Sequence, residues 1–275
     1  MGAWIMAGVT FREAGRKKMI WMALLAGLAF LALFGASLHF QVKDWGGGKL
    51  TLMQRAQLNA MLLAGLYVLN LMTMAMTILA SVDTLSGEIA SGTIHVVATK
   101  PLPRWQVLIG KWCGFAGMLV LYIAIMVAGL SFLTWLLSGY QAPHLLRGCA
   151  LIGLESLLLL TMTFLVGTTF STLTNGVVVL GLYGLAFLGG WIEQFGALAN
   201  SPRALNLGIA ASVVMPSEAL WRRAAFEMQS PLVGAMGFTP FSNASVPSAA
   251  MVVYAGLYLA LALLLAIRRF AQRDL

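Results

Sequence analysis

The chain has 275 residues, of which 60% are hydrophobic and only 9% are charged. Soluble domains carry about 25% charged residues, so this composition excludes an ordinary soluble protein and predicts an integral membrane protein. The formal net charge is +8, but the basic residues are dispersed among the loops that separate the apolar segments. Such dispersal indicates membrane topology and contact with the lipid bilayer, and it does not favour nucleic-acid binding.

Six apolar segments have the length and composition of membrane spans. They cover residues 19–40, 58–82, 112–137, 149–170, 177–192 and 251–267. A spanning helix needs about 20 apolar residues, so the fifth and sixth segments must borrow flanking residues. Lipid offers the backbone no hydrogen-bonding partner, and the segments must therefore be helical. The sequence predicts an all-α integral membrane protein with six transmembrane helices in a single domain, residues 1–275.

Residues 1–18 precede the first span. A signal peptide also places a basic region before an apolar run, but the run that follows here is too long for a signal core and has no clear small-x-small cleavage site. We expect a retained first span and, before it, an interfacial elbow helix. Four apolar residues would enter the interface and four basic residues would face lipid phosphates: Trp4, Ile5, Val9, Phe11, and Arg12, Arg16, Lys17, Lys18. The two groups separate along the segment more than around it, so a frayed basic tail is the alternative.

The basic residues also indicate the orientation of the chain, because cytoplasmic loops carry an excess of Lys and Arg. If the N-terminus is cytoplasmic, the inner segments hold ten of these residues and the outer segments hold seven. An even number of spans returns the C-terminus, with Arg268, Arg269 and Arg273, to the same side. We therefore expect a multi-pass protein of the cell (inner) membrane with both termini in the cytoplasm.

Motifs for catalysis and for cofactor binding are absent from the sequence. It contains no phosphate-binding loop of the type G-x-x-x-x-G-K-[ST], no H-E-x-x-H and no G-x-S-x-G, and its three histidines lie in separate loops. Cys113 and Cys149 fall near opposite ends of neighbouring spans, too far apart for a disulfide, and we expect both to be packing thiols. The sequence predicts neither an intrinsic cofactor nor a metal site, and it disfavours an intramembrane enzyme.

The loop between the second and third spans, residues 83–111, is the most informative polar segment. The step Ser91-Gly92 can end the helix that leaves the membrane. Residues 93–99 would then form about two turns of helix, and Pro101 and Pro103 would terminate it. A short helix between two breaks, at the membrane surface, could transmit motion from a soluble partner to the spans. An ordinary connecting loop is the alternative.

The long segment after the fifth span, residues 193–250, is too apolar to be disordered. Pro216 can start a helix that places four apolar residues on one face: Leu220, Trp221, Ala224 and Met228. Two ion pairs of i,i+4 spacing would lie elsewhere around the same helix: Glu218 with Arg222, and Arg223 with Glu227. We expect an amphipathic helix that lies at the outer leaflet or dips into it, and that caps the exit of a dimer or docks a periplasmic partner. Surface stabilisation without such a role is the alternative.

Glu155 is the one clear ionisable residue inside a predicted span. Ionisable residues within a bilayer are costly and often mark a transport path. A polar contact in a substrate path or at a subunit interface is therefore one interpretation. A carboxyl group that is protonated or hydrogen-bonded to Ser or Thr of another helix is the other.

Several of these residues together resemble the permease subunits of the type-2 (exporter) superfamily of ATP-binding-cassette transporters. The inner loop of that superfamily runs from an acidic residue through Gly-Thr, a short apolar helix and Pro-x-x-Arg to Gly-Lys. Here these positions are Glu88, Gly92-Thr93, residues 94–98, Pro101-Leu-Pro-Arg104 and Gly110-Lys111. The stretch from Met215 to Arg223 is most similar to the branch named for multicopper-enzyme maturation, typified by the permease that serves nitrous-oxide reductase assembly.

The resemblance implies a function and a set of partners. Two copies, or this chain with a homologue, would form a twelve-span pore. Each would bind a separate cytoplasmic ATPase, two copies per complex, which holds the ATP and Mg. The coupling residues would be Glu88, Thr93, Ile94, Val96, Val97 and Arg104, helped by the loop at residues 171–176. The alternative is a mechanotransmitter that drives a periplasmic partner, such as a metalloenzyme maturation factor.

Overall fold

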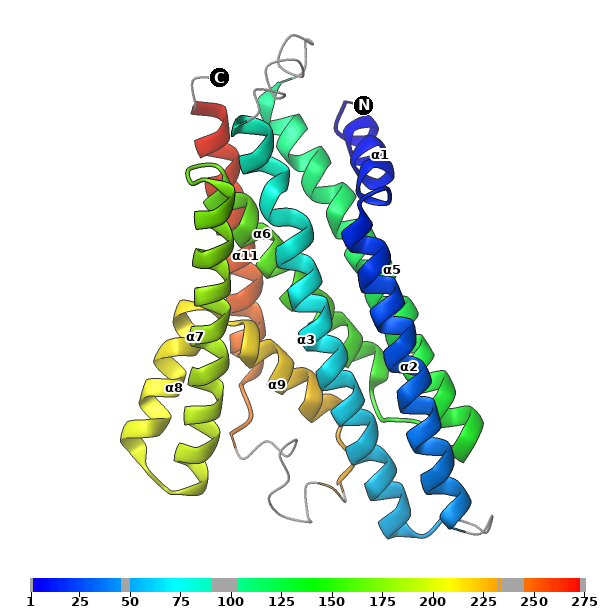
Figure 1. Ribbon diagram of the computed structural model, residues 1–275. Helices are drawn as coiled ribbons and strands as arrows, with labels where there is room; N and C mark the ends of the chain where they lie inside the picture. Colours follow the sequence, from blue (N-terminus) through cyan, green and yellow to red (C-terminus); the bar gives the residue numbers. More distant parts are fainter. Residues whose placement is uncertain (1, 46–49, 91–102, 232, 234–244, 273–275) are drawn as a thin grey trace.

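The protein is helical throughout the residues that its computed structural model describes, which are 2–45, 50–90, 103–231, 233 and 245–272 (Figure 1). The helices are α1 (Gly2–Ala14), α2 (Lys18–Asp44), α3 (Leu52–Ala90), α5 (Arg104–Ser138), α6 (Leu145–Gly167), α7 (Thr172–Leu198), α8 (Pro202–Val214), α9 (Ser217–Met228) and α11 (Ala249–Gln272). No β-strand occurs within the described ranges.

Six of these helices are long and apolar enough to cross a membrane: α2, α3, α5, α6, α7 and α11. The six predicted spans are thereby confirmed. The fifth and sixth do borrow flanking residues, since α7 has 27 residues and α11 has 24. The helix ends differ from the predicted ends, because most of these helices continue beyond their apolar segments.

The six spans form one bundle, with the N- and C-termini at the same end (Figure 1). We call this the terminal end and the opposite one the far end. Helices α3 and α6 lie in the interior, with 61% of the most apolar window of each buried, whereas α2 and α11 are peripheral at 17%. Leu62, Leu66, Leu119 and Phe164 belong to the core between α3, α5 and α6. The peripheral helices turn large apolar side chains outward, as lipid contact requires.

The predicted loop of residues 83–111 is shorter than expected. Helix α3 continues to Ala90, and α5 begins at Arg104 with Pro103 as its N-cap. The predicted loop therefore includes the last two turns of α3 and the first two turns of α5. The helix expected over residues 93–99 lies outside the described residues.

The elbow segment is helical, and its small residues pack against α5. Ala7 and Thr10 of α1 are buried, and they face Gly110 and Gly114, which are one turn apart on α5. A Cβ atom at Gly114 would lie 2.8 Å from the carbonyl oxygen of Ala7. Only glycine permits this approach of two helix backbones. Because Ala7 and Thr10 pack against α5, the segment is a docked helix and not a frayed tail. Trp4, on the same helix, is 81% exposed.

Helix α9 and the segment at residues 171–176 differ from the sequence-based expectation. Helix α9 was predicted to be an amphipathic helix with one apolar face, lying at the outer leaflet or dipping into it. Nine of its twelve residues are buried, which is more than one face, and it packs against α6, α7, α11 and α3 (Figure 1). It follows α8 at a bend of 106°. The loop predicted over residues 171–176 is mostly the first turn of α7, because Ser171 caps that helix by accepting a hydrogen bond from the Thr174 amide.

Candidate functional site

The two helices that flank the predicted coupling segment are joined by an ion pair. Glu88 lies near the end of α3 and Lys111 lies in the second turn of α5, and the Lys111 ammonium donates to Glu88 Oε2. The Lys111 side chain is only 6% exposed, so its charge is shielded from water and depends on this partner. We call the paired ends of α3 and α5 the coupling stem.

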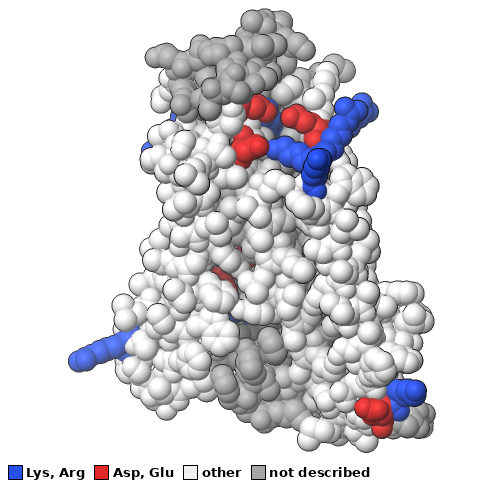
Figure 2. Space-filling view, in the orientation of Figure 1, with Lys and Arg blue, Asp and Glu red and all other residues white. Residues whose placement is uncertain are grey.

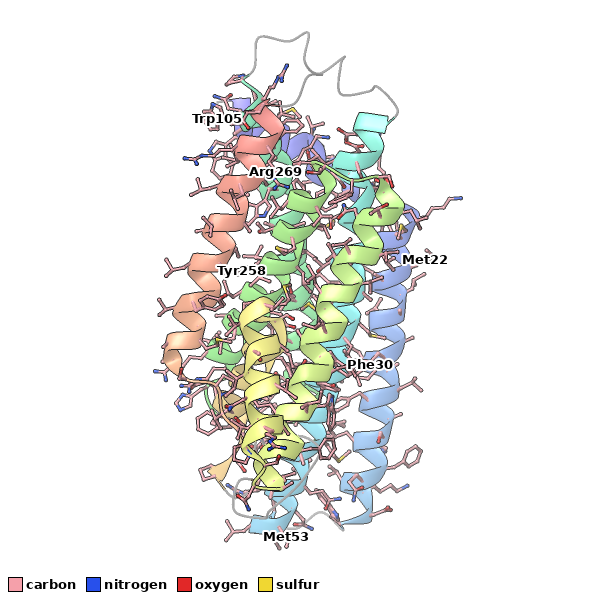
Figure 3. The ribbon with its side chains drawn as sticks, turned by 90° about the vertical axis from the view of Figure 1, so that its left-hand side faces the viewer. Met22, Phe30, Met53, Trp105, Tyr258 and Arg269 are labelled. Carbon is pink, nitrogen blue, oxygen red and sulfur yellow. The ribbon has the colours of Figure 1, made fainter. Side chains whose placement is uncertain are left out.

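Further contacts connect the coupling stem to neighbouring helices at the terminal end. Lys17, just before α2, pairs with Asp83 of α3 at 3.3 Å. Arg104, the first residue of α5, donates to the carbonyl oxygen of Ala271 in α11 at 3.2 Å. Figure 3 shows α11 and the start of α5 together at this end, where Arg269 and Trp105 are labelled. These contacts connect the stem to α11 and to the residue that precedes α2.

Charged side chains gather at this same end of the molecule. Figure 2 shows acidic and basic residues together near the top of the view, above a broad uncharged surface. They include the residues that line a cavity of about 300 Å³ between α1, α3 and α5, among them Glu13, Lys17, Asp83, Glu88 and Lys111. The uncharged surface below them has the composition that contact with lipid requires.

A second polar cluster lies inside the far half of the bundle. Arg222 of α9 donates to Glu193 Oε2 of α7 at 2.7 Å, and the two side chains are 3% and 5% exposed. The other oxygen of Glu193 accepts a hydrogen bond from Ser245 at 2.6 Å. Arg222 was predicted to pair with Glu218. Its guanidinium forms a close ion pair with Glu193 in the interior, and the carboxyl group of Glu218, which is buried as well, lies within electrostatic reach of it.

The remaining predicted residues of α9 lie partly as expected. Trp221 is buried and packs against the ring of Tyr67, with 5.3 Å between the ring centroids. Arg223 donates to Glu227 at 2.6 Å, which confirms the predicted i,i+4 ion pair. Helix α9 thus buries its apolar face and also two of its charged residues, Glu218 and Arg222.

Glu155 has no exposed surface and lies on α6 next to Asn70 of α3 and within electrostatic reach of Glu218. Neither of its carboxylate oxygens has a hydrogen bond of good geometry among the described residues. The structure therefore places Glu155 inside the chain and away from its lipid-facing surface. Its part in a substrate path or an interface stays a prediction.

Hydrogen bonds between helices occur in both halves of the bundle. Asn59 of α3 donates to the carbonyl oxygen of Met228 at 3.0 Å and accepts from the Ser230 amide at 2.8 Å, so it holds the end of α9. Nearer the terminal end, Ser81 and Thr163 join α3 to α6 at 2.7 Å. Because lipid cannot compete for such bonds, they specify how the spans pack.

Sequence reasoning missed some of these residues and placed others outside what the structure describes. Thr93, Ile94, Val96 and Val97 are not among the described residues. Glu193 and Asn59 received no role, because their partners are distant in sequence. Cys113 and Cys149 are both free thiols, as predicted. In the described part of the chain, no three His, Cys, Asp or Glu residues come close enough together to hold a metal ion.

The fold defines a class before any comparison is made: a multi-pass helical membrane protein whose polar contacts lie at the terminal end and inside the bundle. The family model described as ABC-2 family transporter protein matches residues 4–275, and the chain therefore belongs to that family. It is a permease subunit of an ATP-binding-cassette transporter, and such a subunit works with a partner ATP-binding subunit. No curated protein matches the chain.

Proposed function

We propose that this permease couples ATP hydrolysis by a separate cytoplasmic ATPase to export of a substrate. The ATPase would dock on residues 93–99, through Ile94, Val96 and Val97, with Thr93 beside them. The complex would hold two ATPase subunits, which bind the ATP and Mg, and two permease chains, identical or homologous. The substrate path would run between the two permeases. Glu155 is buried inside one chain, so it would contact a substrate only if the helices around it separate during transport.

The observation that best supports this proposal is the coupling stem. Glu88 and Lys111 join α3 to α5 on either side of the proposed docking segment, and Arg104 joins α5 to α11. Because this ion pair joins α3 to α5 at the base of the docking segment, a displacement of that segment would move both helices together. Glu88 was expected to face the ATPase; its bond to Lys111 gives it the proposed role of positioning the segment.

The proposed orientation places the terminal end in the cytoplasm of a cell with the permease in its inner membrane. Both termini lie at this end, as an even number of spans requires. The excess of Lys and Arg in the segments assigned to this side supports the same orientation. The docking segment, between α3 and α5, then faces the cytoplasmic ATPase.

A second candidate function is mechanotransmission to a periplasmic partner, and one observation favours it. Helix α9 is anchored to the spans by the buried Arg222–Glu193 pair and by Asn59. Movement of α3 or α7 would therefore reach the far end, where a periplasmic protein could dock. The similarity of residues 215–223 to the multicopper-enzyme maturation branch supports this candidate. Co-purification of a periplasmic protein would favour it over export.

Purification of the permease from native membranes tests the proposal. We expect a separate ATPase to co-purify and the complex to hydrolyse ATP. The isolated permease should not hydrolyse ATP, because its sequence has no phosphate-binding loop. Mass spectrometry identifies the partners, and a phosphate-release assay measures the activity of both samples. ATP hydrolysis by the isolated chain, with no contaminating ATPase, would contradict the assignment.

A further inference from the structure

A polar cavity and an apolar groove lie next to each other along one face of α3, and we call the two together the seam. The polar cavity, near the terminal end, has a volume of about 300 Å³ and is lined by α1, α3 and α5. The groove has a volume of about 280 Å³ and is lined mainly by α2 and α3, with Tyr122 of α5. Neither the docking of an ATPase nor the orientation of the chain accounts for them.

The residue spacing places the two cavities next to each other on one face of α3. Leu79 and Ala80 line the groove, and Asp83 and Thr84, one turn further along the same face of α3, line the polar cavity. On the other wall, Lys17 lines the polar cavity, and Met19, two residues later, lines the groove. One turn of helix rises only about 5 Å, so one molecule with a polar and an apolar part can fill both.

The charges of the polar cavity favour a ligand with a positive group. Three carboxylates, of Glu13, Asp83 and Glu88, face two ammonium groups, of Lys17 and Lys111, which leaves one negative charge. Glu88 and Lys111 neutralise each other. Asp83 is 59% exposed beside Lys17, and Glu13 forms no ion pair with any described residue. A ligand ammonium can therefore bind Glu13 and Asp83, while a ligand phosphate can bind Lys17 at the rim.

The groove below has the character of a site for a hydrocarbon chain. Its walls are almost wholly apolar and include four methionines, Met19, Met22, Met72 and Met76, whose flexible side chains fit irregular apolar surfaces. Met22 and Leu79 are 60% and 51% exposed, so the groove opens to the membrane-facing surface. Figure 3 labels Met22 on α2, near the terminal end.

We propose that this seam binds a phospholipid with an ethanolamine headgroup. The ammonium lies between Glu13 and Asp83, the phosphate lies beside Lys17, and one acyl chain lies along the groove between α2 and α3. An anionic headgroup without an amine fits less well, since the cavity carries excess negative charge. The site contacts α1 and both helices of the coupling stem, so its occupancy would affect how they pack. It rests on neither the proposed function nor the proposed orientation.

Native mass spectrometry of the full permease tests the proposal, with phosphatidylethanolamine and phosphatidylglycerol added at equal concentration. We expect the wild type to retain the ethanolamine lipid about ten-fold better, the effect of one charge-assisted hydrogen bond. The double variant Glu13→Gln/Asp83→Asn should lose this preference. Asp44→Asn, an exposed carboxylate at the far end, is the matched control and should keep it.

The groove is tested separately by filling it. Ala26 of α2 lines the groove and is exposed, so Ala26→Trp should fold and should retain about ten-fold less of either lipid. Ala36→Trp, at an exposed position of α2 outside the groove, should bind like the wild type. Equal retention of both lipids by the wild type, or full retention by Ala26→Trp, would overturn the proposal. So would a disulfide-linked dimer formed in membranes by Met22→Cys, because a second copy would then cover the groove.

Discussion

Replacement of Arg222 by Met should destabilise the protein by about 3–5 kcal/mol, because it leaves the carboxylate of Glu193 buried without its cation. The two side chains are 3% and 5% exposed and lie 2.7 Å apart, so water cannot take the place of the guanidinium. Ser245 can donate only one hydrogen bond to Glu193, which does not balance the charge. Thermal unfolding of the purified protein in detergent measures the loss.

Arg223 is a matched control on the same helix. It pairs with Glu227 at 2.6 Å, but its side chain is 24% exposed. Pairs that water reaches contribute about 0–1 kcal/mol, so Arg223→Met should have a much smaller effect. The double variant Glu193→Gln/Arg222→Met removes both charges and should recover much of the loss. Equal melting temperatures for Arg222→Met and Arg223→Met would show that the buried pair does not hold α9 in place.

Replacement of Gly114 by Leu should release the elbow helix from α5. The new Cβ would lie 2.8 Å from both the Ala7 carbonyl oxygen and the Thr10 Cβ. The first of these atoms is backbone, so it cannot move aside without the helix. Overpacking of this kind costs about 1–3 kcal/mol. Because exposed Arg12 and Arg16 are sites for trypsin, the expected readout is cleavage at these residues about ten-fold faster than in the wild type.

Gly117 provides the control for this experiment. It lies three residues further along α5, and a Cβ atom there would have no neighbour within 4 Å. Gly117→Leu introduces the same side chain on the same helix and should leave the cleavage rate unchanged. If both variants were cleaved at the same rate, the packing of α1 against α5 would not be what protects the elbow segment.

The six spans could be predicted from sequence because hydrocarbon imposes the same requirement on each of them. About 20 apolar residues must occur together wherever a helix crosses, and that signal is local. The helix ends could not be predicted in the same way. Helix α3 has 39 residues, more than a bilayer needs. It extends beyond the predicted span at both ends, and its last two turns contact Lys17 and Lys111.

The position of α9 shows what a local pattern leaves undetermined. The spacing of Leu220, Trp221, Ala224 and Met228 correctly predicts a helix with a buried face. It does not reveal that the opposite face is buried too, because the partner of Arg222 is Glu193, 29 residues earlier. From sequence alone, a charged residue is predicted to be exposed unless its distant partner is known. The i,i+4 pair of Arg223 and Glu227 was predictable because both partners lie on one helix.

In the candidate site, too, the local features could be predicted from sequence and the contacts between distant residues could not. The resemblance of residues 88–111 to a permease loop predicts a coupling segment, and it assigned Glu88 to an external partner. The bond from Lys111 to Glu88 depends on how α3 and α5 approach each other. Gly110 and Gly114 have the spacing of a helix-packing motif, yet the sequence does not say that α1 is the helix that packs there.

The coupling of this permease to its ATPase is tested most directly at the docking segment. Ile94→Asp or Val97→Asp would bury a charge without a partner in the interface, at about 1–3 kcal/mol, which weakens association about ten-fold or more. Leu146→Asp, at a position 85% exposed at the start of α6, is the control. Co-purification and ATP hydrolysis are measured for each variant. The account predicts that the ATPase is lost or uncoupled only in Ile94→Asp and Val97→Asp. Full retention of the ATPase and of its stimulated activity in both would contradict it.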